Sequence, residues 1–66
     1  MEPKYPEVEV ELEGQDGNVF SIMGRVRKAL RRGGASHEEV EAFTAEMQAG
    51  DYDDALQTVF RWVTVA

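Results

Sequence analysis

Apolar and acidic residues alternate near the start of the chain. Val8, Val10 and Leu12 take every second position of a segment whose other positions are glutamates. A period of two is typical of a β-strand that buries one face and exposes the other. The pattern predicts a half-buried strand over residues 7–13, and residues 1–6 are expected to form a flexible N-terminal tail.

After residue 18 the apolar residues recur every three or four positions, which is typical of an amphipathic helix. Residues 14–18 are rich in turn formers, and Asn18 is placed to cap a helix by accepting a backbone hydrogen bond. We predict a helix from Val19 to about Arg32, ended by Gly33 and Gly34. Its apolar face consists of Val19, Ile22, Met23, Val26, Ala29 and Leu30.

Gly24 lies inside this predicted helix. Glycine within a helix costs ~1 kcal/mol relative to alanine, because glycine loses more backbone freedom on folding. A close crossing with another helix would explain the glycine without any ligand.

A second helix is predicted after residue 36. Ser36 and Glu39 have the spacing of a capping box, in which each side chain accepts a hydrogen bond from the other residue's backbone. Gly50 is expected to end this helix. Its apolar stripe consists of Val40, Phe43 and Met47.

A third helix is predicted to begin after Asp51, which is placed to cap it. The apolar positions of this helix are Tyr52, Leu56, Val59, Phe60 and Val63. Residues 62–65, Trp-Val-Thr-Val, are rich in strand formers. They either continue the helix or leave it to pair with the first strand.

Together the patterns predict a small α+β domain over residues 1–66, with one N-terminal strand followed by three short helices. A single strand leaves backbone groups unpaired. Its partner is therefore either the C-terminal segment or a strand of a second copy, which would make a homodimer. The predicted core comprises Val8, Val10, Leu12, Ile22, Met23, Val26, Leu30, Val40, Phe43, Met47, Leu56, Val59, Phe60 and Val63.

Length and composition narrow the class of protein. A chain of 66 residues has room for one domain, and it buries only ~60% of its unfolded surface. It has no cysteine, which suits a reducing compartment. Neither a signal-like start nor an apolar run of ~20 residues is present. We therefore expect a cytoplasmic protein that does not enter a membrane.

The charge is distributed unevenly. The net charge is −6, but five of the seven basic residues lie between positions 25 and 32, with no acidic residue among them. This stretch carries +5, which leaves −11 for the remainder once +5 is subtracted from −6. The face of the first helix opposite its apolar side is the candidate binding site, formed by Arg25, Lys28, Arg31 and Arg32.

Few residues are suited to catalysis or metal binding. The only histidine, His37, lies in the first turn of a predicted helix, and a nucleophile needs a base that is held by a third group. A structural zinc site needs four cysteine or histidine ligands, and this chain has one histidine and no cysteine. Asp51, Asp53 and Asp54 could supply oxygen ligands, but the other ligand positions of a calcium-binding loop are missing. The turn before the first helix lacks the lysine and serine of a phosphate-binding loop. The sequence predicts no catalytic residue, no metal and no cofactor.

A set of residues spread over most of the chain resembles a family of small bacterial, phage and plasmid proteins of unknown function. The set consists of Tyr5, Pro6, Val8, Val10, Leu12, Gly14, Asp16, Gly17, Asn18, Phe20, Ile22, Gly24, Ala29, Leu30, Arg31, Arg32, Gly50, Asp51, Tyr52, Asp53, Leu56, Thr58, Arg61, Trp62 and Val63. The chain departs from the family pattern at Val19, Asp54 and Ala55, where alanine, histidine and leucine are usual. The resemblance implies an accessory gene of a mobile element or its host, and it supplies no catalytic residue.

The favoured hypothesis is a non-catalytic accessory protein that binds another protein through its charge-polarised surface, as a monomer or a homodimer. One alternative is nucleic-acid binding through the basic face of the first helix, which the surrounding −11 opposes. Another is that Glu7, Glu9, Glu11 and Glu13 mimic a row of phosphates and block a host DNA-binding protein. The basic residues could also pair within the molecule, with Glu38, Glu41 or Glu46.

Overall fold

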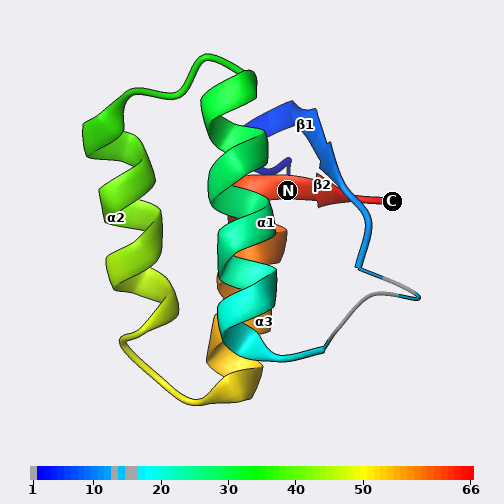
Figure 1. The fold of residues 1–66 in the computed structure, drawn as a ribbon, viewed down its shortest axis with the longest axis vertical. Coiled ribbons are helices and arrows are strands. Elements are labelled where there is room, and N and C mark those ends of the chain that lie inside the picture. The colour runs from blue at the N-terminus through cyan, green and yellow to red at the C-terminus, as the bar shows by residue number, and fades with distance from the viewer. Residues whose placement is uncertain (1, 13, 15–16) are drawn as a thin grey trace.

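The computed structural model describes residues 2–12, 14 and 17–66. The chain forms a single α+β domain with a strand at each end and three helices between them, as Figure 1 shows. The elements are β1 (Tyr5–Val10), α1 (Val19–Arg32), α2 (His37–Met47), α3 (Tyr52–Trp62) and β2 (Val63–Val65). The predicted class and order of elements are confirmed.

The two strands form one parallel sheet, so the first strand finds its partner in the same chain. The helix α3 ends at Trp62 and β2 follows at once, which decides between the two conformations open to residues 62–65. The pairing is irregular between Tyr5 and Glu9, where the Thr64 hydroxyl donates to the Pro6 carbonyl at 2.8 Å.

The strand β1 begins and ends earlier than the alternating pattern predicts. It starts at Tyr5 and ends at Val10. The Lys4 backbone N–H donates to the Arg61 carbonyl at 2.9 Å, so the end of the expected N-terminal tail is attached to α3. Glu13, the predicted last residue of the strand, lies outside the described residues.

The helices follow their local signals closely. The helix α1 has the predicted bounds, and the Asn18 side chain accepts a hydrogen bond from the Phe20 N–H at 2.8 Å. At its other end Gly34 has a φ of 92°, and the Ala35 N–H donates to the Leu30 carbonyl at 2.9 Å. This left-handed ending is the one for which glycine is favoured.

The second and third helices differ in how they are capped. Ser36 accepts a hydrogen bond from the Glu39 N–H at 3.2 Å, but the Glu39 carboxylate accepts one from the Lys4 side chain. Both halves of a capping box are present at Asp51 and Asp54 instead. The helix α2 ends at Met47, before the predicted stop at Gly50.

The helix α1 packs against β1 and α2, and α3 packs against α2 and β2. The buried core comprises Val8, Val10, Ile22, Met23, Val26, Leu30, Val40, Phe43, Met47, Ala55, Val59, Trp62 and Val63. Leu12 and Leu56 are only partly buried, and the prediction that Phe60 is a core residue is wrong, because 49% of its surface is exposed. The buried face of α3 instead carries Ala55, Thr58, Val59 and Trp62, so Phe60 falls outside it.

Candidate functional site

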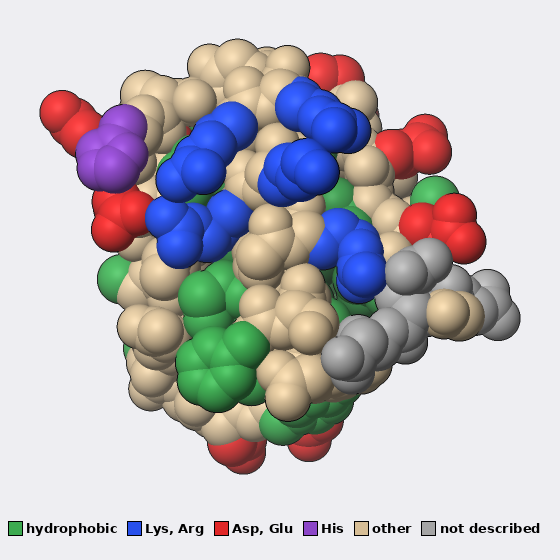
Figure 2. Space-filling view, in the orientation of Figure 1, with side chains coloured by type: hydrophobic (Ala, Val, Ile, Leu, Met, Phe, Trp, Pro, Cys, Tyr) green, Lys and Arg blue, Asp and Glu red, His purple; other side chains and the backbone are tan. Residues whose placement is uncertain are grey.

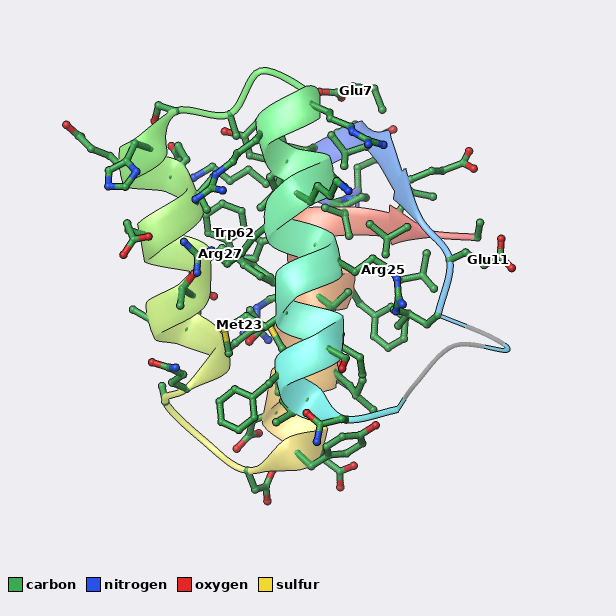
Figure 3. The ribbon with its side chains drawn as sticks, in the orientation of Figure 1. Glu7, Glu11, Met23, Arg25, Arg27 and Trp62 are labelled. Atoms are coloured by element: carbon green, nitrogen blue, oxygen red, sulfur yellow. The ribbon has the colours of Figure 1, made fainter. Side chains whose placement is uncertain are left out.

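The basic residues of α1 divide into paired and unpaired groups. Figure 2 shows Lys and Arg side chains gathered over one half of α1, with acidic side chains on both flanks. Arg27 points toward α2 in Figure 3 and forms an ion pair with Glu41 at 3.1 Å. Lys28, Arg31 and Arg32 are exposed, and they form no ion pair with any residue that the structure describes.

Internal pairing therefore accounts for part of the basic cluster only. Of the three predicted acidic partners, Glu41 pairs with Arg27, while Glu46 pairs with Arg61 of α3 at 3.4 Å. Exposed pairs of this kind contribute ~0–1 kcal/mol to stability. The unpaired cations remain available to a partner.

An open groove of about 460 Å³ lies between α1 and β1. One wall consists of residues 7–11, and the other carries Arg25, Lys28 and Arg32. These three cations lie on one side of α1 because their spacings are three and four residues. Arg31 does not line the groove, so the structure brings together three of the four predicted site residues.

The groove has walls of opposite charge. Glu7, Glu9 and Glu11 are exposed on the strand wall, and Arg25, Lys28 and Arg32 belong to the helix wall. Figure 3 places Glu7 and Glu11 at opposite ends of this strand segment and Arg25 on the side of α1 that faces it. Alternation in the sequence indicated the exposed glutamates, but it could not show that they border the basic helix.

The end of α1 lies close to β1 because Gly33 has no side chain. A Cβ atom at this position would come within 2.5 Å of Val8 Cγ2. Gly33 and Ala29 also line the groove, so its lining includes two small residues at the α1 side. The close contact brings the three cations to the edge of the strand.

Two further pockets lie elsewhere on the described surface. One, of about 260 Å³, is mainly apolar and includes the exposed side chains of Phe20 and Tyr52. The other, of about 240 Å³, lies beside the ion pair of Glu46 and Arg61. Neither contains any of the predicted site residues.

Residues that could act in catalysis or bind a metal are separated from one another or have structural roles. Asp51 and Asp54 form the capping box of α3, and His37 is exposed at the start of α2. No cluster of three or more potential metal-ligating residues occurs among those described. Within the same residues, no helix has the length and apolar character needed to cross a membrane.

Comparison with protein-family models, curated proteins and solved structures yielded no significant match to this chain. The proposals below therefore depend on the geometry and charge of the groove.

Proposed function

We propose that this chain is a non-catalytic accessory protein that binds an acidic region of another protein through the basic face of α1. The supporting observation is the contrast between two sets of cations. Lys4, Arg27 and Arg61 are engaged by carboxylates of the same chain. Lys28, Arg31 and Arg32 are exposed and lack such partners among the described residues.

Exposed cations in an acidic molecule are suited to selecting a partner. Complementary charge raises the rate of association and disfavours partners with the wrong charge. The helix supports these side chains rigidly, because its apolar face is buried against β1 and α2. The basic face is therefore a fixed surface patch within a molecule whose net charge is −6.

Nucleic-acid binding is the competing use of the same cations. Phosphates could contact Lys28 and Arg32 on successive turns of α1. The exposed glutamates of β1 lie beside this face, however, and would repel a phosphate backbone that follows the groove. We therefore favour a protein partner with a limited acidic region.

Mimicry of nucleic acid is a third use of the surface, and the exposed row of Glu7, Glu9 and Glu11 favours it. Glu7 and Glu9 lie two residues apart on β1, a separation of ~6.7 Å in a strand, and Glu11 follows the last residue of β1. Glu13, the fourth member, lies outside the described residues. A host DNA-binding protein captured through these glutamates would support this reading.

The test is affinity capture from lysate of the source organism, with and without nuclease. Three baits are compared: the native chain, Lys28→Gln/Arg31→Gln/Arg32→Gln, and the control Ala42→Glu/Ala45→Glu/Gln57→Glu. Both variants make the net charge of −6 more negative by the same amount, and the control positions are exposed on α2 and α3.

We expect a protein that is retained by the native chain and the control after nuclease treatment, and lost from the neutralised variant. If recovery of the captured material is lost after nuclease treatment, nucleic-acid binding would replace the proposed protein binding. Equal recovery on all three baits would show that the basic face is not the binding surface.

A further inference from the structure

The groove beside α1 follows the open edge of β1. The sheet has two strands, so β1 has one edge paired with β2 and one edge without a strand. The groove is lined by five consecutive residues, 7–11, and by no residue of β2. Side chains of consecutive strand residues point to opposite faces, so a groove that touches all five runs along the edge.

An open edge presents backbone N–H and C=O groups that can pair with another strand. Only alternate residues of a strand direct these groups to one edge. The carbonyls of Pro6 and Val10 accept hydrogen bonds from β2 and the residue after it, so the backbone groups of Glu7, Glu9 and Glu11 are the ones that face the open edge. Small residues, Ala29 and Gly33, form the adjoining surface of α1 and leave room for a backbone. The groove thus has the shape required for strand addition.

The charges on the two sides of this edge predict the pattern of the added strand. Val8 and Val10 point into the core, toward α1, and the glutamates point to the opposite face. Side chains of an added strand on the core side would face Lys28 and Arg32. Side chains on the opposite side of the added strand would lie beside Glu7, Glu9 and Glu11.

A second copy of this chain does not fit these charges. Two β1 strands paired antiparallel about a two-fold axis would keep both α1 helices on one face of the joined sheet. Cations would then face cations on that side, and glutamates would face glutamates on the other. Like charges in such positions are destabilising.

We propose that the open edge of β1 binds an extended segment of a partner protein by strand addition, with acidic side chains toward Lys28 and Arg32 and basic side chains beside Glu7, Glu9 and Glu11. This inference rests on the proposed function and specifies the partner's chemistry. The ligand is a strand with alternating charge rather than a simple acidic patch.

The experiment is a titration of the labelled full chain with blocked synthetic peptides, followed by NMR and amide hydrogen exchange. The first peptide alternates Glu and Lys over about eight residues, enough to span a typical strand. The second has the same composition with all Glu before all Lys, and the third is oligoglutamate of equal length. The fourth and fifth are the alternating peptide with N-methyl groups on every second residue, one peptide for each set of alternate residues.

We expect the alternating peptide to bind at least about tenfold more tightly than the block peptide, with slowed exchange of the amides of Glu7, Glu9 and Glu11. At least one N-methylated form should lose binding, because the methyl group removes a donor of the ladder while leaving the charges. Arg32→Gln should weaken binding severalfold, whereas Arg31→Gln removes the same charge outside the groove and should not.

Oligoglutamate binding as tightly as the alternating peptide, with shifts limited to α1 and no protection of β1, would overturn strand addition and leave the proposed function standing. Absence of binding by every peptide would overturn the strand-addition site. The capture experiment would then decide the proposed function separately, because it requires no particular ligand conformation.

Discussion

Gly24 lies inside α1 and Gly33 directly follows its last residue, and the two glycines have different surroundings. A Cβ atom added to Gly24 would meet no heavy atom within 4 Å beyond its chain neighbours and the nearby backbone of its own helix, and one added to Gly33 would meet Val8. The prediction that Gly24 permits a close helix crossing is therefore wrong. Gly33 is the residue that lets two elements approach each other, where α1 meets β1.

These surroundings predict opposite effects of the same substitution. Gly24→Ala should stabilise the fold by about 0.5–1 kcal/mol, because alanine loses less backbone freedom in a helix and has space for its methyl group. Gly33→Ala should destabilise it by about 1–3 kcal/mol through overpacking against Val8. Thermal unfolding followed by circular dichroism would measure both. A Gly24→Ala variant that melts below the native chain would contradict the assignment of this position to open helix surface.

Trp62 joins three elements through one side chain. Its ring stacks on Tyr5 with 6.1 Å between centroids, meets Phe43 edge-on, and has Lys4 Nζ 4.5 Å from its centroid. Its indole N–H donates to Glu46 at 3.2 Å. A hydrogen bond from Lys4 to Glu39 holds the lysine in place and raises its pKa above the ordinary value.

Tyr5, Tyr52 and Asp51 have structural roles of the same kind. Tyr5 and Trp62 stack on each other, the Tyr52 hydroxyl donates to the Gly17 carbonyl at 2.8 Å, and Asp51 caps α3.

At the scale of the elements, local signals determine most of what could be predicted. The cap at Asn18 and the glycines after Arg32 define α1, and its bounds match the prediction. The limits of β1 could not be derived from alternation, because its end depends on the short partner β2. The sequence places Phe60 in the core because its distance from the other apolar residues fits the period of a helix. Its side chain lies just outside the face that α3 buries.

The cap of α3 provides a test at this scale. Asp51 accepts a hydrogen bond from the Asp54 N–H at 3.0 Å, and the Asp54 carboxylate accepts one from the Asp51 N–H at 3.3 Å. Asp51→Ala should therefore cost about 1 kcal/mol and lower the melting temperature by about 4–8 °C. Asp53→Ala, in the same exposed first turn, is the matched control and should cost less than half as much, since only the interaction with the helix dipole is lost. Equal losses in urea or thermal unfolding would show that the cap contributes nothing beyond its charge.

At the scale of the whole molecule, the candidate site combines elements that the sequence treats separately. The charge pattern indicated a basic helix face and an acidic strand face. Their meeting at one groove depends on the contact of Gly33 with Val8 and on parallel pairing across three intervening helices. Such long-range contacts leave no periodic pattern in the sequence. The sequence therefore could not separate Arg31 from the three cations that line the groove.

The same charges predict the state of association. Chain pairing through β1 would place like charges together on both faces of the joined sheet, so the native chain should remain a monomer at low salt in light scattering. The variant Glu7→Lys/Glu9→Lys/Glu11→Lys/Lys28→Glu/Arg32→Glu reverses the three glutamates of the strand wall and two of the three cations of the helix wall. It should also be monomeric alone, for the same reason.

An equal mixture of the native chain and this reversed variant should contain heterodimers, because each wall then faces its opposite charge across the open edges. Rising salt should dissociate the heterodimers, because the screening length falls to ~3 Å at 1 M. Reversal of Arg31 in place of Arg32 keeps the same net charge but leaves Arg32 as well as Arg25 unchanged in the groove, so it should give weaker association. A native chain that dimerises at low salt would contradict the charge argument, because the open edge of β1 would then be selecting a second copy over an oppositely patterned strand.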